Sequence, residues 1–258
     1  MGRIASLYRY PVKGLSPEPV ISAELQAGGH FPHDRLYAIE NGPSGFDPGQ
    51  PVHKPKICFL MLMRNESLAR LRTRFDEDRK QLRIESPDGS VASFALEEPE
   101  GRSALEAFFA RYSAGDLRGA PRLLSSPPGY RFMDSGRSGF VSLMNLASVK
   151  DLGTKAGAEL DPLRFRANVH LDGLGAWEEM SWVGKKIRVG AATLEVLKPI
   201  DRCLATHVDP QSGARNVDVT GKLRRAYGHI NCGIYAKIVY SGEIRPGDQA
   251  CPEPDLFS

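Results

Sequence analysis

Alternating apolar and polar residues dominate this chain and predict β-strands. Residues 234–240 alternate in this way, and the run stops at Ser241-Gly242. Residues 83–91 and 186–197 each read as two strands joined by a tight turn, at Pro-Asp-Gly and at Gly-Ala respectively. Residues 1–10 lead directly into a further strand. The pattern therefore predicts a chain rich in β-structure.

Helical periodicity occurs only in short segments. The candidates are residues 66–75, 103–113, 145–155 and 219–227. A layered α/β fold needs a helix between most strands, and these segments are too few for it. We expect a mainly β fold of the α+β class, in which strand-rich barrels carry a few peripheral helices.

One shift in composition marks a candidate domain boundary. Residues 115–139 are rich in Gly, Pro, Ser and Arg and show little periodicity. This stretch is typical of a connection between an N-terminal β unit, residues 1–115, and a C-terminal unit, residues 116–258. It is equally compatible with a long active-site loop within one domain.

Composition and charge exclude several classes of function. The 258 residues are 41% hydrophobic and 25% charged, with a formal net charge of only +3, and the basic residues form no run. A nucleic-acid partner is therefore not indicated. The N-terminus lacks a signal-peptide core, and no window approaches the roughly 18 apolar residues of a membrane span. We expect a cytoplasmic protein without a membrane partner.

The four cysteines direct attention to a single thiol. Cys58, Cys203, Cys232 and Cys251 are far apart and form no C-x-x-C pair, which argues against a zinc ribbon, an iron–sulfur cluster and a thioredoxin-like site. Without a secretory signal, disulfides are not expected either. Cys203 follows Arg202 at the end of a predicted strand. A neighbouring cation stabilises the thiolate form of a cysteine, which can then act as a nucleophile or as a soft metal ligand.

Several basic residues are candidates for binding an anion. Residues 164–169 resemble a strand that places Arg164, Arg166 and Asn168 on one face, where guanidinium forks match tetrahedral oxyanions. A solvated sheet face explains the same pattern. The loop 133–140 resembles an anion cradle but also many ordinary loops.

The histidines give little support for a metal site. His207 lies four residues after Cys203, and His30 and His33 bracket two residues, but no second ligand pair completes a zinc site. Cys203 and His207 also resemble a cysteine-hydrolase dyad. Such partners need no proximity in sequence, so their spacing does not support one.

Four motifs in order resemble the MOSC family, the molybdenum cofactor sulfurase C-terminal domain, preceded by the N-terminal β-barrel module of the same proteins. The resemblance covers nearly the whole chain. The motifs are Tyr10-Pro-Val-Lys-Gly14, Arg164-Phe-Arg-Ala-Asn168, the R-C-x-x-T-x-V-D-P-x-[ST]-G pattern at residues 202–213, and Gly242-Glu-Ile-Arg-Pro-Gly-Asp248.

The resemblance implies a molybdenum cofactor and assigns roles to residues. Cys203 falls on the thiolate that coordinates molybdenum or carries sulfur, and a soft thiolate suits a metal held by a pterin dithiolene. Arg166 and Asn168 fall on the motif that holds the pterin and its phosphate. The remaining implied contacts to the cofactor, or to the turn around the cysteine, are Lys13, Arg35, Ser138, Arg202, Thr206 and Asp209. His207 receives no role.

Two functions remain open at this point. The first is an oxidoreductase that cleaves N–O bonds of small N-hydroxylated substrates with electrons from a separate donor protein. The alternative is a carrier of persulfide sulfur or of molybdenum cofactor through Cys203, supplied by a pyridoxal-phosphate-dependent sulfur donor. We expect no pyridoxal phosphate site, iron–sulfur site or membrane anchor in the chain itself, unlike some relatives. The cofactor-contact motifs favour the reductase.

Overall fold

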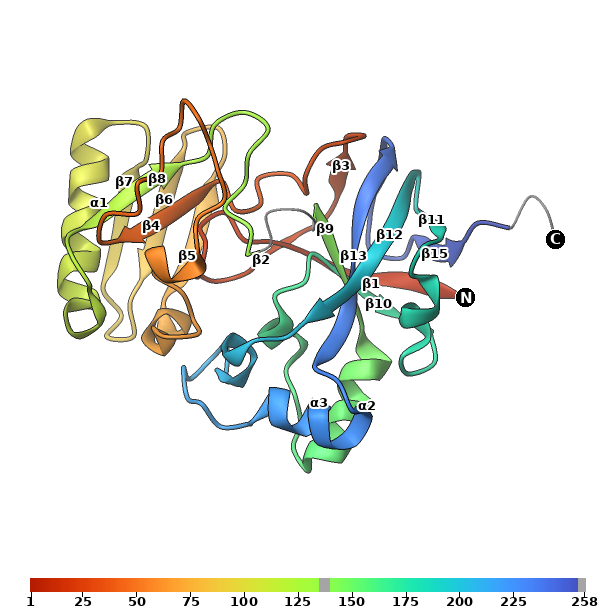
Figure 1. The fold of residues 1–258 in the computed structure, drawn as a ribbon. Helices are drawn as coiled ribbons and strands as arrows, with labels where there is room; N and C mark the ends of the chain where they lie inside the picture. Colours follow the sequence, from red (N-terminus) through yellow and green to blue (C-terminus); the bar gives the residue numbers. More distant parts are fainter. Residues whose placement is uncertain (135–139, 255–258) are drawn as a thin grey trace.

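Seven strands, drawn from both ends of the chain, close into a barrel (Figure 1). The computed structural model describes residues 1–134 and 140–254. The strand order is β10-β9-β13-β12-β11-β15-β1, and β1 pairs with β10 to complete the ring. The strands are β1 Gly2–Arg9, β9 Val141–Asn145, β10 Val169–Asp172, β11 Lys186–Val189, β12 Ala192–Asp201, β13 Asn231–Tyr240 and β15 Gln249–Pro252.

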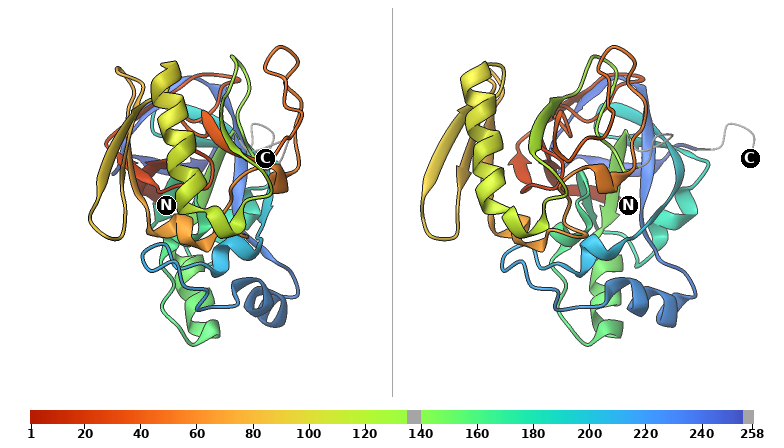
Figure 2. Two further views of the ribbon diagram at one scale, coloured as in Figure 1. Left: turned by 90° about the vertical axis from the view of Figure 1, so that its left-hand side faces the viewer. Right: turned by 60° about the vertical axis from the view of Figure 1, so that its left-hand side comes forward.

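A second unit of strands and one helix packs beside the barrel. Two short pairings connect its chain to the barrel: β2 (Glu18–Val20) lies on β1, and β3 (Ala23–Leu25) pairs with β14 (Gly242–Ile244). Figure 2 shows that the helix runs along the outer side of this unit, away from the barrel. The elements are β4 Tyr37–Asn41, β5 Arg72–Asp76, β6 Gln81–Glu85, β7 Val91–Ala95, β8 Pro121–Ser125 and α1 Pro99–Tyr112.

Each unit has its own hydrophobic core. Alternate residues of the barrel strands, such as Leu143, Leu194 and Ile234, point inward and are fully buried. In the second unit, Phe109 of α1 packs with the inner faces of β5, β6 and β7. Full burial of such side chains contributes about 1.5–3 kcal/mol each, so both units are stabilised independently by their period-two patterns.

Most of the expected elements are present. The turns at 86–90 and 190–191 join β6 to β7 and β11 to β12. The helix expected at 103–113 is confirmed as α1, and those at 145–155 and 219–227 as α2 (Leu146–Ala156) and α3 (Val219–Tyr227). Asn145 caps α2 by accepting a 3.0 Å hydrogen bond from the Ala147 amide, and Asp218 caps α3.

The prediction of a helix at residues 66–75 is wrong. A short 3-10 turn, Glu66–Arg70, is followed directly by β5. Thr73 and Phe75 pair with Ile84 and Leu82 of β6, and Phe75 is buried in the core. Strand pairing and burial on one face thus override the weak helical pattern.

The prediction of a strand at residues 164–169 is also wrong. Residues Pro162–Phe165 form a 3-10 turn, whose start is fixed by a 2.8 Å hydrogen bond from the Leu163 amide to the Asp161 carboxylate. Arg166 then adopts a left-handed backbone with φ 52°, and β10 starts only at Val169. The three polar side chains therefore do not share one strand face and serve different purposes.

The fold class is confirmed as mainly β, with a closed barrel, a second strand-rich unit and three α-helices in the described residues. The boundary at residue 115 stays a prediction. Strand pairing crosses that position, because β8 pairs with β4 and β1 belongs to the barrel. In the part of the chain that the structure describes, no helix is both long and apolar enough to cross a bilayer.

We expect the protein to lose stability in acid because His170 of β10 is buried in the barrel wall. Its ring packs on Tyr8 at 5.0 Å, and burial lowers its pKa to about 4. An unfolded histidine titrates near 6.5, so the unfolded chain binds more protons between these values, and the free energy of unfolding falls as the pH falls. Between pH 7 and pH 5 we expect urea unfolding to show a loss about 2 kcal/mol larger for wild type than for His170→Phe. Equal losses would contradict it.

Candidate active site

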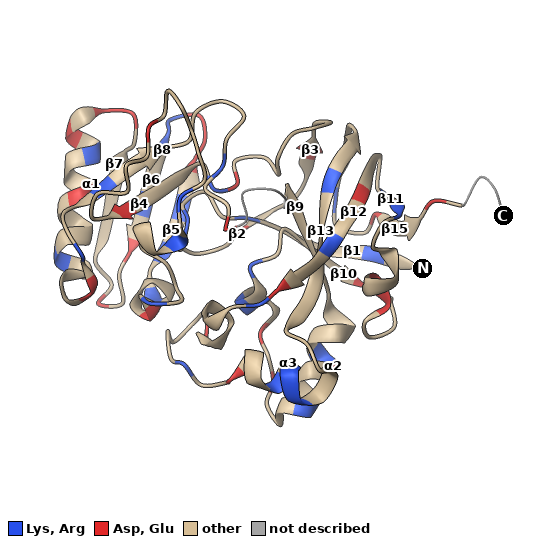
Figure 3. Ribbon diagram, viewed as in Figure 1, with Lys and Arg blue, Asp and Glu red and all other residues tan. Residues whose placement is uncertain are grey.

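A cavity of about 340 Å³ lies between the barrel and the second unit, and both units line it. This volume lies within the range of small-molecule and cofactor sites. Lysines and arginines are spread over both units, with several on α3 (Figure 3). The cavity itself is strongly basic, since its lining contains two carboxylates, Asp134 and Asp201, against Lys13, Arg35, Lys56, Arg164, Arg166, Lys198 and Arg202.

Arg35 and Arg166 both line this cavity and both contact the ring of Tyr10. Their guanidinium carbons lie 4.8 and 4.3 Å from the centre of the Tyr10 ring, as cation–π contacts require. Both arginines have left-handed backbones, with φ 51° and 52°. A residue other than glycine keeps this conformation only where the surrounding structure holds it. Arg35 Nη2 donates to the Arg166 carbonyl at 3.1 Å, and Arg166 Nη1 donates to the Leu15 carbonyl at 2.7 Å.

The electrostatic environment of these two arginines differs. Burial lowers the pKa of Arg166 to about 10, because no carboxylate pairs with it directly among the described residues. For Arg35, burial acts in the same direction, but the ion pair with Asp34 outweighs it and raises the pKa. Of these two arginines, Arg166 is therefore the one that an incoming anion would stabilise more.

Lys13 adds a buried ammonium to the same wall. Its Nζ donates to the Phe132 carbonyl at 3.1 Å and forms an ion pair with Asp134. Burial lowers the pKa of Lys13, and Asp134 offsets part of this effect. Burial would raise the pKa of Asp134, but Lys13 outweighs it and holds that pKa well below its usual range.

Cys203 lies at the end of β12, just before the 3-10 turn Leu204–His207, and its side chain is partly exposed to the cavity. Thr206 fixes the backbone of this turn. Its amide and its Oγ1 both donate to the Cys203 carbonyl, at 3.0 and 2.9 Å. The sulfur is therefore presented from a rigid turn.

Arg202 is buried directly beside the cysteine. Its Nε donates to the Cys232 carbonyl at 2.6 Å, and its Nη1 donates to the Phe165 carbonyl at 2.8 Å. Nη2 is buried and has no hydrogen-bond partner within the described ranges. Burial lowers the pKa of Arg202, and an unpaired donor of this kind favours a bound anion.

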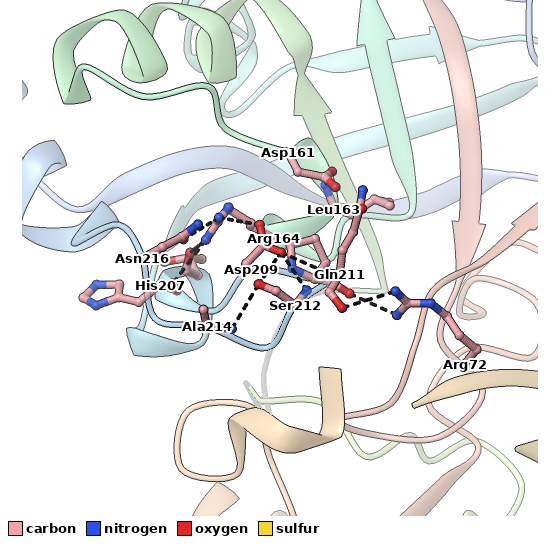
Figure 4. Close-up of polar contacts among 12 residues, drawn as sticks. Arg72, Asp161, Leu163, Arg164, His207, Asp209, Gln211, Ser212, Ala214 and Asn216 are labelled. Atoms are coloured by element: carbon pink, nitrogen blue, oxygen red, sulfur yellow. Dashed lines mark hydrogen bonds and ion pairs between the residues drawn. The ribbon is translucent and has the colours of Figure 1, made fainter. Parts of the chain in front are cut away.

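Arg164 and Asp209 organise the loop that follows the cysteine (Figure 4). Arg164 Nη2 pairs with Asp209 Oδ2 at 2.8 Å and with Asn216 Oδ1 at 2.6 Å, and its Nη1 donates to the His207 carbonyl at 3.1 Å. Asp209 Oδ1 accepts from the amide of Ser212 at 2.8 Å and from its hydroxyl at 2.9 Å. The two residues thus hold loop 203–216 in one shape.

Two arginines connect loop 203–216 to the second unit. Arg72 of β5 donates to the carbonyls of Pro210 and Gln211 at 3.2 and 3.3 Å (Figure 4). From the loop, Arg215 reaches the opposite way and pairs with Glu66 at 2.9 Å. The second unit therefore supports the cysteine loop from outside the barrel.

Six of the nine predicted site residues line one cavity. They are Lys13, Arg35, Arg166, Arg202, Cys203 and Thr206. Asp209 supports the loop and does not line the cavity. Asn168 is fully buried in the barrel wall, where Ser142 donates to its Oδ1 and its Nδ2 donates to the Tyr8 carbonyl at 3.1 Å. Ser138 lies outside the described residues. The cofactor roles of all nine residues stay predictions.

Sequence reasoning missed part of the lining. Lys198 and Ile200 precede Arg202 on β12 at a spacing of two, so period-two alternation was a usable signal for that face. Tyr235 lies on β13 within the alternating run 234–240. No comparable signal identified Lys56 or the segment Met61–Met63, because they belong to the second unit and reach the cavity only through the packing of the two units. His207, which received no role, bonds Thr220 through Nε2 at 2.9 Å.

Comparison with known families assigns the chain to a class. The model of the MOSC N-terminal beta barrel domain matches residues 1–119, and the model of the MOSC domain matches residues 133–250. This is a barrel protein with a basic, cysteine-bearing cavity, and the chain belongs to the MOSC family.

The chain is similar to curated relatives over segments of different length. Mitochondrial amidoxime-reducing component 1 of Homo sapiens is 25% identical over 236 residues, covering 83% of this chain and 68% of that protein. Molybdenum cofactor sulfurase of Homo sapiens is 37% identical over 91 residues, covering 35% of this chain. The matches span only 9% of the human sulfurase and 8% of the Bos taurus sulfurase. The crystal structure of the YUAD protein from Bacillus subtilis covers 97% of this chain and 94% of its own at a TM-score of 0.45 and 14% identity.

Proposed function

We propose that this protein binds molybdenum cofactor and reduces N-hydroxylated small molecules with electrons from a separate donor protein. One observation carries the proposal: the Cys203 thiol opens on the same cavity as the buried cations Lys13 and Arg202 and the partly buried cations Arg35 and Arg166. A soft sulfur ligand beside a cluster of anion-binding donors matches a metal held by a phosphorylated pterin. The name of the amidoxime-reducing relative supports the substrate class.

The residues present fit such a cofactor. Arg202 Nη2 is a buried donor without a partner in the described part of the chain, and Arg166 carries a partly buried charge that an anion would stabilise. No group of three or more His, Cys, Asp or Glu side chains that could hold a metal occurs among the described residues. Cys203 would thus provide one protein ligand, and the pterin dithiolene would provide others.

Each residue of the cavity has a distinct task in this proposal. When bound, the cofactor supplies the two-electron chemistry that cleaves an N–O bond. Cys203 would hold the metal, and Lys13, Arg35 and Arg166 would bind the anionic part of the cofactor. Tyr235 lines the cavity, and burial raises its pKa, so its Oη stays protonated and can donate a hydrogen bond to a substrate oxygen.

A carrier is the second candidate, and the partial exposure of Cys203 favours it. An accessible thiol can accept persulfide sulfur from a pyridoxal-phosphate-dependent donor and pass it on. The sulfurase names of two relatives agree with sulfur chemistry. A carrier, however, has no need of the buried cations that line the cavity.

Metal content separates the two candidates. We expect wild type from a host with intact cofactor synthesis to contain near-stoichiometric molybdenum and pterin, and Cys203→Ala to contain no molybdenum. Cys251→Ala, which changes a partly exposed cysteine on β15, is the matched control and should retain the metal. Elemental analysis and pterin fluorescence measure both components. Metal-free wild type with a persulfide on Cys203 by mass spectrometry would reject the reductase in favour of the carrier.

A further inference from the structure

The segment Met61–Met63 forms an apolar part of a cavity that is otherwise basic. It belongs to the second unit, and all three of its residues line the cavity. Met61 is buried in its own unit, whereas Leu62 and Met63 are only partly buried. The partly exposed side chains of Leu62 and Met63 are therefore available to a molecule in the cavity.

Backbone hydrogen bonds hold this segment in place. The Leu60 amide donates to the Ile39 carbonyl of β4 at 2.8 Å, and the Met61 amide donates to Asn65 Oδ1 at 2.9 Å. Asn65 is itself buried, and its backbone amide donates a 2.8 Å hydrogen bond to the Met61 carbonyl. The segment is thus a turn with a fixed backbone.

Arg215 connects this turn to the cysteine. Its Nη2 donates to the carbonyls of Leu62 and Met63 at 3.3 and 2.8 Å, and its Nη1 donates to the carbonyl of Leu204, the residue after Cys203, at 3.3 Å. One guanidinium therefore spans the two backbones. This contact places the apolar turn directly beside the sulfur-bearing loop.

The chemistry of this surface selects a particular kind of substrate. Thioether side chains adapt to irregular shapes and make favourable contacts with aromatic rings. Beside Leu62, the cavity adjoins a small apolar crevice that Ala205, Val208 and Pro210 also line. The basic wall, in contrast, provides charge for an anion.

We infer that Leu62 and Met63 form a subsite for a planar apolar substituent next to Cys203, and that Arg215 is the positioning residue that holds it there. The inference rests on the proposed function for the reacting N–O group. The subsite gives that function its substrate class: aromatic N-hydroxylated compounds in preference to small polar ones. Arg215 acts only through the turn.

The subsite can be measured on the chain without cofactor. Full-length protein from a host that lacks cofactor synthesis is treated with N-phenylmaleimide or N-methylmaleimide, whose alkene adds the Cys203 thiolate to form a thioether. Peptide mass spectrometry follows Cys203 alone. We expect the phenyl-to-methyl rate ratio to fall at least about fivefold in Leu62→Asn and Met63→Gln. Ile21→Asn, at an 89% exposed position, is the control and should not change it.

Arg215 is tested by two substitutions on the same assay. Arg215→Leu should lower the ratio as the subsite variants do, and Arg215→Lys, which keeps a donor, should restore part of it. In cofactor-loaded protein, the same variants should raise KM for benzamidoxime more than KM for acetamidoxime, with kcat less affected.

The outcomes separate the subsite from the proposed function. An unchanged ratio in Leu62→Asn and Met63→Gln would overturn the subsite. A ratio lowered in those two but not in Arg215→Leu would overturn the positioning role. If wild type from a host with intact cofactor synthesis lacks molybdenum, while the cofactor-free chain still discriminates between the maleimides, the proposed function is rejected and the apolar subsite stands.

Discussion

Arg166→Glu is expected to abolish retention of pterin and molybdenum while the chain remains folded. Charge reversal opposes a phosphate at a cation of the cavity wall that has no directly paired carboxylate among the described residues. The fold survives, because the new carboxylate faces Lys13 and Arg35 instead of an apolar core. Metal analysis and pterin fluorescence measure the loss, and thermal unfolding measures the fold.

Two further variants separate the charge from the backbone at this position. Arg166→Gly removes the cation and the left-handed strain together, so we expect loss of cofactor with a thermal midpoint within about 5 °C of wild type. Arg188→Glu makes the same charge reversal at an exposed position of β11 and should retain the cofactor. Retention by Arg166→Glu itself would show that this wall does not bind the anion.

Gly233→Ala is expected to lower the free energy of unfolding by about 3 kcal/mol or more. Gly233 lies in β13 with φ 76°, and a Cβ there would come within 2.6 Å of the Leu143 carbonyl oxygen and 2.9 Å of Arg202 Nη2. The backbone of β9 cannot move without breaking the barrel ladder. Urea denaturation measures the loss, and displacement of Arg202 should reduce cofactor retention as well.

Gly228→Ala is the matched control for this substitution. Gly228 follows α3 with φ 77°, but a Cβ there has no atom within 4 Å. Only the left-handed penalty applies, so we expect a loss of about 1–2 kcal/mol. Equal losses in the two variants would mean that the close approach at Gly233 carries no additional cost.

The fold was predictable wherever pattern and local turn chemistry agree. Residues 186–197 alternate and turn at Gly190-Ala191, and both strands pair as expected. Helices α2 and α3 combine apolar spacing with side-chain caps at Asn145 and Asp218. These signals lie within a dozen residues of one another, so no knowledge of distant contacts is needed.

Prediction failed at Arg164–Asn168, where tertiary contacts decide the structure. A strand would have placed Arg164 beside Arg166. Instead, Arg164 turns toward Asp209, while Arg166 contacts Tyr10 and Leu15. These partners lie up to 156 positions away in the sequence, and a local pattern contains no record of them.

The candidate site was predictable in its residues more than in its geometry. The family resemblance named Lys13, Arg35, Arg166 and Cys203, which are far apart in the sequence and meet in one cavity. The apolar turn Met61–Met63 has no motif. It reaches the cavity only because the second unit packs against the barrel.

The pairing of β1 with β10 and β15 also sets the order in which the molecule can be completed. Of the barrel strands, a ribosome releases β1 first and β15 last. β1 can pair with β10 once residue 172 has been made, but the barrel cannot close until β15 follows. Contacts of such long range carry a high loop-closure cost and slow folding. The second unit, whose strands lie between residues 37 and 125, can form earlier. The cysteine cavity needs both units and is therefore among the last features to appear in a newly made molecule.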